Sequence, residues 1–376
     1  MAKQKVSGTA TLLAGGDVGP LVEHPEEFVN EVLPVLQQAD IRLVQCERVY
    51  SKRGWPPHFA PGSGGDQCRC EPEKASIYKK AGIDVVSLAS NHAMDWGPDA
   101  LVDTVELFRN MGMQVIGAGR NIEEATRPAI VEKNGVRMAI LGYCSVLRDG
   151  QEAAPDRPGA AAMRAHAYYE QEDYQAGTPP RVITVPYEKD MKALQEDIGK
   201  AKAQADAVVL VMHWGLHHIP KTIATYQPQF AHAAIDAGAD LIIGHHAHIL
   251  KAVEVYKGKV CFYSICNLMT TGKTKPRQNC SWGLYWWETD PETPLYRFHI
   301  DSRKTVLVKA VFSKKGVERV SFLPAFINKS AHPEVLNRED PKFDEVLNYM
   351  EWVSDQFPHT FEVEGDEVVV QANAGK

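Results

Sequence analysis

The chain has 376 residues, of which 44% are hydrophobic and 24% charged, enough apolar material for a large buried core. Its formal net charge of -7, without a long basic run, argues against nucleic acid as the main partner. No segment approaches the length of a membrane-spanning helix, and the short apolar stretch near the start resembles a first core strand more than a signal peptide. We therefore expect a globular cytoplasmic protein that does not bind a membrane.

Short apolar runs alternate with amphipathic stretches from residue 7 to residue 268, a pattern typical of a β-sheet covered by helices. This pattern predicts strands at 9–14, 41–46, 85–89, 114–116, 138–143, 207–212, 241–243 and 260–264. It predicts helices at 26–38, 73–81, 98–111, 188–203 and 226–237. The sequence therefore predicts an α/β protein with its polar residues gathered where strands end.

Three segments rich in Gly, Pro or charge, 51–72, 148–180 and 270–281, are candidate rim loops. The middle segment has the length of a substrate lid, although a flexible insertion fits equally well. Beyond residue 285 the pattern predicts a hairpin at 305–322, a helix at 341–356 and a second hairpin at 360–371. We expect residues 1–290 to form the main domain and residues 291–376 to pack on it or extend it.

The seven cysteines are an odd set, and four of them lie in apolar runs, which favours buried thiols in a reducing compartment over a disulfide framework. Cys68 and Cys70 lie in a Gly/Pro-rich loop as Cys-Arg-Cys. Because no second pair follows at zinc-site spacing, exposed thiols are favoured there over a structural zinc.

The segment Ile-Ile-Gly-His-His-Ala-His is the strongest single signal, because an apolar strand runs directly into His245, His246 and His248. Such clusters bind metal ions more often than they pack in a core. On an extended segment His246 and His248 would point the same way, so both would reach one ion or two adjacent ions.

Four further strand ends carry a metal-ligand type of side chain: Asp17, Glu47, Asn91 with His92, and His213. Carboxylates, an amide oxygen and imidazoles form the mixed shell typical of two-metal hydrolytic sites. Such a shell suits manganese, zinc, iron or cobalt, and two such ions lower the pKa of a bound water and hold the negative oxygen that forms during attack. We therefore predict two divalent metal ions as cofactors.

Asp95 follows His92 by three residues, so it could orient this imidazole by a hydrogen bond. His92 would then act as a general acid toward the leaving group. Asp95 could equally be the N-cap of the helix predicted near Pro98.

Over roughly residues 8–270 the chain resembles the CapA family of poly-gamma-glutamate capsule biosynthesis proteins. The resemblance rests on the strand end at Glu47 and on the motifs Gly-Gly-Asp-Val-Gly, SLASNHAMDWG, VMHWG, AAIDAGADLIIGHHAHIL and YSICN. The resemblance implies a four-layer α/β/β/α sandwich of metallophosphatase (calcineurin-like) type, which a small C-terminal α+β appendage would complete. It implies a metal centre and a catalytic imidazole, His92. The implied metal ligands are Asp17, Glu47, Asn91, His213, His246 and His248, with His245 as a candidate addition.

The chain departs from the family pattern at three positions. Gly19 stands where metallophosphoesterases have the histidine of an opening Asp-x-His, so one metal position has fewer protein ligands. Gln45 replaces the usual Asn two residues before the glutamate, and Cys266 replaces the Gly before Asn267. Many relatives carry a membrane anchor and we expect none in this chain, which argues against a nascent capsule polymer as substrate.

The resemblance favours a hydrolase in which metal-activated water attacks an amide, with a gamma-glutamyl-like or other small-molecule or short peptide-like substrate. Arg148 or Lys273 would bind a substrate carboxylate. A phosphomonoesterase or phosphodiesterase is the alternative from the wider fold. A non-catalytic, metal-stabilised capsule-biosynthesis subunit is the third, although such a site has no need of an oriented, uncoordinated imidazole.

Overall fold

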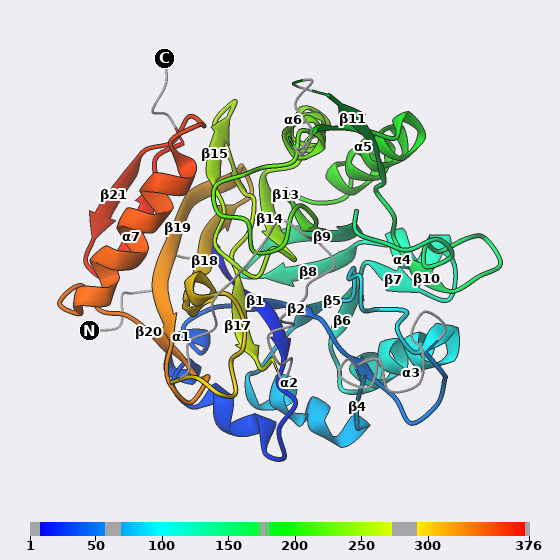
Figure 1. Cartoon of the computed structure of the whole chain (residues 1–376), viewed down its shortest axis with the longest axis horizontal. Coiled ribbons are helices and arrows are strands. Elements are labelled where there is room, and N and C mark those ends of the chain that lie inside the picture. Colours follow the sequence, from blue (N-terminus) through cyan, green and yellow to red (C-terminus); the bar gives the residue numbers. More distant parts are fainter. Residues whose placement is uncertain are drawn as a thin grey trace.

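The computed structural model describes residues 8–56, 69–171, 173, 178, 180–272 and 292–372. Two β-sheets form its framework (Figure 1). The larger sheet contains β1 (Ala10–Gly19), β2 (Ile41–Cys46), β5 (Val85–Ser87), β6 (Gln114–Ile116), β17 (Asn267–Thr270), β18 (Lys304–Ser313), β19 (Gly316–Ile327), β20 (Pro333–Val335), β21 (Phe361–Glu364) and β22 (Glu367–Val370). The smaller sheet contains β8 (Ala129–Lys133), β9 (Val136–Cys144), β13 (Ala207–His213), β14 (Leu241–His245), β15 (Val253–Tyr256) and β16 (Lys259–Phe262).

Strand order places the predicted metal-binding segments near the middle of each sheet. The larger sheet has the order β21-β22-β19-β18-β1-β2-β5-β6, with β17 also paired to β1 and β20 to β19. The smaller sheet has the order β15-β16-β14-β13-β9-β8. Within them, β1, β2 and β5 are parallel to one another, as are β9, β13, β14 and β16. The carboxyl ends of these strands therefore lie along one edge of each sheet.

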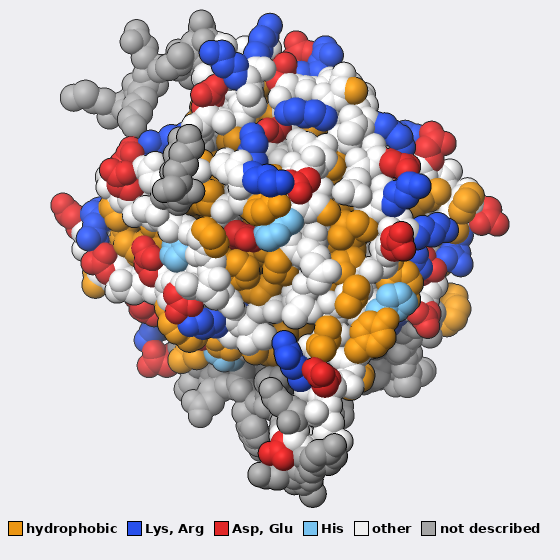
Figure 2. All heavy atoms as spheres, turned by 90° about the horizontal axis from the view of Figure 1, so that it is seen from above, with side chains coloured by type: hydrophobic (Ala, Val, Ile, Leu, Met, Phe, Trp, Pro, Cys, Tyr) orange, Lys and Arg blue, Asp and Glu red, His pale blue; other side chains and the backbone are white. Residues whose placement is uncertain are grey.

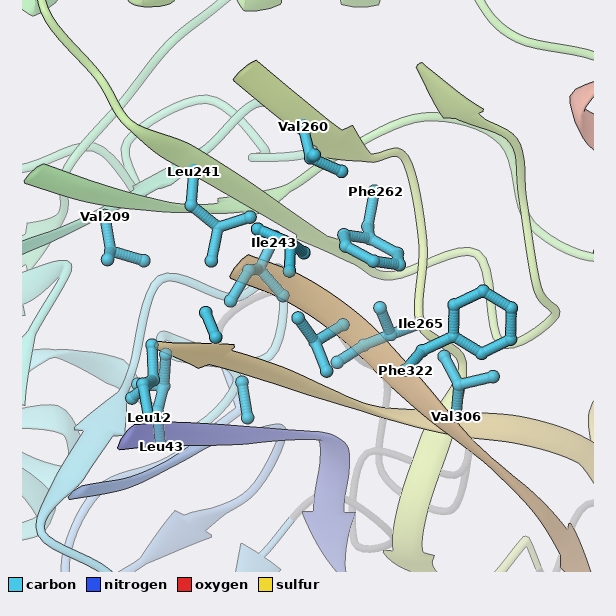
Figure 3. Packing of buried hydrophobic residues seen from close by; sticks show 14 of the residues in the cluster. Leu12, Leu43, Val209, Leu241, Ile243, Val260, Phe262, Ile265, Val306 and Phe322 are labelled. Atoms are coloured by element: carbon cyan, nitrogen blue, oxygen red, sulfur yellow. The ribbon is translucent and has the colours of Figure 1, made fainter. Parts of the chain in front are cut away.

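The two sheets pack face to face around the main hydrophobic core (Figure 3). Leu12 and Leu43 of the larger sheet face Val209, Leu241 and Ile243 of the smaller one, and all five are buried. Alternate residues along these strands point the other way, as period-two side-chain geometry requires.

Helices cover the outward faces. On the larger sheet lie the 3-10 helix η1 (Pro25–Val29) and the helices α1 (Leu33–Leu36), α2 (Ser76–Lys80) and α3 (Gly97–Asn110). On the smaller sheet lie α5 (Glu188–Lys202) and α6 (Tyr226–Asp236). This is a four-layer α/β/β/α sandwich, so the layer arrangement predicted from the sequence is confirmed.

The predicted strands are all present, but two segments differ from the prediction. The helix expected at 26–38 is divided into η1 and α1, because Pro34 lacks a backbone N–H and fits only the first turn of a helix, where it lies in α1. The candidate lid 148–180 contains an antiparallel hairpin of β11 (Ala165–Glu170) and β12 (Arg181–Pro186) that is mostly exposed.

The C-terminal strands continue the larger sheet, since β18 pairs with β1 and β19 pairs with β18. Helix α7 (Pro341–Ser354) joins the core between the sheets through Phe343, Val346 and Met350. Acidic and basic side chains are interspersed on the face seen from above (Figure 2). Within the described ranges, no helix has both the length and the apolar character needed to cross a bilayer.

The fold requires glycine where β1 meets β17. A Cβ atom at Gly16 would lie 2.1 Å from the carbonyl oxygen of Cys266, which is backbone and cannot move aside. We predict that Gly16→Ala lowers the free energy of unfolding by about 2–3 kcal/mol, the usual cost of overpacking. Urea unfolding measures this difference.

Gly199→Ala is the matched control, because Gly199 lies exposed in α5 with nothing within 4 Å of the added Cβ. It should be neutral or stabilising by up to about 1 kcal/mol through helix propensity. Equal stability of both variants would contradict the close approach of β1 and β17.

Candidate metal centre

The six ligands predicted at strand ends lie together. Asp17 lies at the end of β1, Glu47 follows β2 and Asn91 follows β5, all in the larger sheet. His213 ends β13, and His246 follows β14 in the smaller sheet. Both sheets therefore contribute side chains to one cluster, which has formed because their parallel strands end on the same side.

Four side chains converge on a first metal position. The Nε2 atom of His213 lies 2.7 Å from Asn91 Oδ1, 3.2 Å from Glu47 Oε1 and 3.2 Å from His246 Nδ1. The ligand atoms of Glu47, His213 and His246 all lie within 4.8 Å of one another. Two imidazoles, a carboxylate and an amide oxygen match a borderline divalent cation.

Three side chains form a second position: Asp17, Glu47 and His248, again with ligand atoms within 4.8 Å of one another. Glu47 Oε2 lies 3.4 Å from His248 Nε2, while Asp17 Oδ2 lies 3.4 Å from His248 Nδ1. Glu47 belongs to both groups, so its two oxygens can bridge two ions.

The position of Gly19 explains why the second group has only three members. A Cβ atom at Gly19 would lie 2.3 Å from Cγ of Arg48, whose side chain is buried there. The Arg48 guanidinium donates to the carbonyl oxygens of Gly19, Glu47 and Thr271. A histidine at residue 19 has no room beside this arginine.

The backbone that carries His246 and His248 differs from the prediction. We expected an extended segment, but β14 ends at His245, and His246 and His248 have φ angles of 85° and 54°. Left-handed backbone is costly for non-glycine residues and clusters at functional sites. These two turns direct His246 to the first position and His248 to the second, instead of placing both on one face of a strand.

The carboxylates of the centre are buried, and most of their oxygens have no hydrogen-bond partner within the described ranges. Asp17 is 0% exposed and Glu47 2% exposed. Among the described residues, neither oxygen of Asp17 has a hydrogen-bond partner, and Glu47 Oε1 also lacks one. Burial and the charge of Glu47 raise the pKa of Asp17 well above its ordinary value. Divalent cations would complete this donor set, so the residues fit the expected metal ions.

His92 and Asp95 form a pair at the edge of the centre. His92 Nδ1 lies 2.6 Å from Asp95 Oδ2, with Asp95 buried and the His92 side chain 23% exposed. Helix α3 begins at Gly97 with Trp96 as its N-cap and has no side-chain cap, so the interpretation of Asp95 as an N-cap is wrong. The pair has the geometry expected of an oriented imidazole.

A loop that the sequence analysis overlooked also contacts the centre. The ring of His217 lies 3.8 Å from that of His246, and the ring of His218 lies 5.6 Å from that of His248. The buried Lys251 amine donates to the carbonyls of Ile219 and Thr222 and so fixes the loop; burial lowers the pKa of Lys251 to about 7. The signal was present in the sequence as two histidines close behind His213.

The remaining predicted residues lie apart from the two ligand groups. His245 Nδ1 is 3.6 Å from Asp17 Oδ1, behind this carboxylate, and His245 is in neither group. Arg148 is exposed, and its backbone N–H donates to Gln151, so its role toward substrate stays a prediction. Lys273 and Cys68 lie outside the described residues. The five described cysteines are buried, so the expectation of an exposed thiol is wrong for Cys70.

Comparison with known proteins gives a family match over most of the chain. The family described as "Bacterial capsule synthesis protein PGA_cap" matches residues 5–271. The capsule biosynthesis protein CapA of Bacillus anthracis is 29% identical over 326 residues, which cover 82% of this chain and 68% of that protein. The PGA biosynthesis protein CapA of Bacillus subtilis is 32% identical over 209 residues, or 55% of this chain and 48% of that protein.

Among solved structures, a hypothetical protein from Thermus thermophilus is similar with a TM-score of 0.43 and 15% identity; the match covers 84% of this chain and 98% of that one. The alignment with the Bacillus subtilis relative spans about half of that relative's length.

The buried Asp17 predicts how stability depends on pH in metal-free protein. Because the pKa of Asp17 in the folded state is above the ordinary value of 3.8, this group lowers stability as the pH rises from about 4 through the folded-state pKa. We predict that Asp17→Asn, in the presence of a chelator, is more stable than the unchanged protein by about 1–3 kcal/mol at pH 7.5, with little difference at pH 4. Urea unfolding at the two pH values measures this.

Asp190→Asn is the control, because Asp190 is a buried carboxylate bound to Arg164 by hydrogen bonds of 2.8 and 2.9 Å. Asp190→Asn should lower the free energy of unfolding of the protein at pH 7.5. A destabilising Asp17→Asn in metal-free protein would show that Asp17 is satisfied without a cation.

Proposed function

Because the chain belongs to the bacterial capsule synthesis protein PGA_cap family, we propose that it is a metal-dependent hydrolase that cleaves an amide of gamma-glutamyl or similar type. One observation carries the proposal. Two buried carboxylates, three of whose oxygens have no hydrogen-bond partner in the described part of the chain, lie among imidazoles, beside a partly exposed histidine that the Asp95 carboxylate orients. The cluster of carboxylates and imidazoles suits divalent cations, and the His92–Asp95 pair suits proton transfer.

Asn91, Glu47, His213 and His246 would hold one ion, and Asp17, Glu47 and His248 the other. Bound ions would supply Lewis acidity, which lowers the pKa of water and stabilises negative charge on a carbonyl oxygen. Glu47 is shared by the two groups, so it would hold both ions close together.

His92 would move a proton to the departing amine. Its Nδ1 is bonded to Asp95, and its Nε2 would be the nitrogen that serves a substrate. The Asp95 carboxylate stabilises the protonated imidazole and holds its orientation, which is the arrangement that a general acid requires. Neither residue belongs to a ligand group.

The surroundings of the centre support an uncharged carbonyl group over a phosphoryl group. His217, His218 and Phe298 have their rings near the ligand histidines. The arginine beside the centre, Arg48, donates to backbone carbonyls. Phosphoryl groups are commonly bound by arginine or lysine clusters. Phosphoester hydrolysis remains the second candidate, because the same ions and His92 would serve an oxygen leaving group.

The substrate class can be tested on purified protein supplied with manganese. Gamma-glutamyl p-nitroanilide and glutamyl dipeptides would be assayed beside p-nitrophenyl phosphate and bis-p-nitrophenyl phosphate. Faster turnover of the amides supports the proposal. Turnover of phosphates alone favours the second candidate, and retained metal with no turnover favours a non-catalytic subunit.

We predict that His92→Ala lowers kcat by about 10²–10⁴-fold, the usual contribution of a general acid, without changing metal content. Asp95→Asn should lower kcat in the same direction and leave metal bound. Steady-state kinetics and elemental analysis of each variant provide the measurements.

His24→Ala is the control, since the His24 side chain is 66% exposed and lies outside both ligand groups. It should keep full activity and full metal content. Loss of metal from His92→Ala would place His92 among the ligands and contradict its role as proton donor.

A further inference from the structure

The metal ligand His248 begins a chain of hydrogen bonds that runs away from the centre. His248 Nδ1 lies 2.7 Å from Asn267 Oδ1, and Asn267 Nδ2 lies 2.6 Å from the Tyr296 hydroxyl. This hydroxyl lies 2.7 Å from the carbonyl oxygen of Ser302. Asn267, Tyr296 and Ser302 are each no more than 1% exposed, so water does not compete for these bonds.

The chain of bonds has a fixed direction because it ends at a backbone carbonyl. A carbonyl oxygen can only accept, so the Tyr296 hydroxyl must donate to Ser302 and accept from the Asn267 amide. The amide oxygen of Asn267 then faces His248 and must accept from Nδ1–H. Burial raises the pKa of Tyr296 well above its ordinary value, which keeps the hydroxyl protonated.

We propose that Tyr296, acting through Asn267, sets the tautomer and orientation of His248 and thereby strengthens ion binding at the Asp17–Glu47–His248 position. With the proton on Nδ1, the lone pair of His248 lies on Nε2, the nitrogen 3.4 Å from Glu47 Oε2. Tyr296 is thus a positioning residue that touches neither ion nor substrate. The inference rests on the metal centre of the proposed function.

Two features make this position sensitive to such control. Among the described residues it has three protein ligands, because Arg48 fills the space at Gly19. If His248 turned away, one of these three ligands would be lost. His248 also has a left-handed backbone with φ of 54°, so its side chain must be held by contacts rather than by a regular strand. Phe298, with its ring centre 5.0 Å from that of His248, restrains the ring from another side.

Tyr296 lies outside the segment matched by the family, which ends at residue 271. Residues 293–303 therefore contribute a contact next to the centre that lies outside the family match. Tyr296 is fixed there by the bond of its N–H to the Thr293 carbonyl and by its bridge to Gly272.

The test measures manganese binding by competition with a chromophoric chelator, using the full chain. Tyr296→Phe keeps the ring but removes the hydroxyl that holds the Asn267 amide. We expect it to lower the affinity for the more weakly bound manganese ion by about 10-fold or more, as the loss of a residue that orients a metal ligand does. Asn267→Asp combined with Tyr296→Phe should restore affinity to within about 3-fold, because a carboxylate accepts from Nδ1–H in either orientation.

Tyr143→Phe is the matched control, since the Tyr143 hydroxyl is buried and donates to Asp197 away from the centre. It should leave both affinities unchanged. Unchanged affinity in Tyr296→Phe, or an equal loss in Tyr143→Phe, overturns the proposal. A failure of the unmodified protein to bind any ion overturns the metal centre itself, which is a separate outcome. If Tyr296→Phe does not fold, Asn267→Ala replaces it, with the same expected loss.

Discussion

The candidate metal centre depends on the burial of two carboxylates side by side. Ligand atoms of Asp17 and Glu47 lie within 4.8 Å of each other, and both residues are almost fully shielded from water. Two unit charges at this separation repel by about 3–4 kcal/mol at an effective dielectric of 20, before the loss of hydration is counted. Positive charge between the two carboxylates would offset this repulsion, which is why the arrangement suits a cation.

The fold imposes this arrangement through several local constraints. Parallel pairing of β1 with β2 brings the ends of the two strands together, and Gly15 and Gly16 let β17 approach β1 more closely than any side chain would permit. Left-handed residues at His246 and His248 store about 1–3 kcal/mol of strain each. The large core between the two sheets offsets these costs, so the stability of the sandwich maintains an unfavourable site.

Strand ends made most of the centre predictable from sequence. Asp17, Glu47 and His213 each follow an apolar run, and parallel strands of one sheet must end on one side. The pattern of apolar and polar residues could not reveal the bends at His246 and His248, because the sign of a residue's φ angle does not change that pattern. The division of the first helix was readable in principle, since Pro34 excludes a continuous helix there.

The residues that sequence reasoning missed act through contacts between distant segments. Arg48 matters because it fills the space beside Gly19, which is close only in the fold. Tyr296 reaches Asn267 from 29 residues away, through a segment without helical or strand periodicity. His217 and His218 lay close to a recognised motif, yet a loop offers no period from which their direction could be inferred.

The C-terminal segments contribute to the centre as well as to the sheet. Tyr296 bonds to Asn267, and Phe298 contacts His248, so residues from beyond the family match lie against a predicted metal ligand. Asp355 and Gln356, just after α7, bind the side chain and the carbonyl of Lys221 in the loop that carries His217. Residues 296–298 and residues 355–356 therefore both make contacts next to the same cluster of imidazoles. The hydrogen bonds of Asp355 and Gln356 join the end of α7 directly to the loop that carries His217.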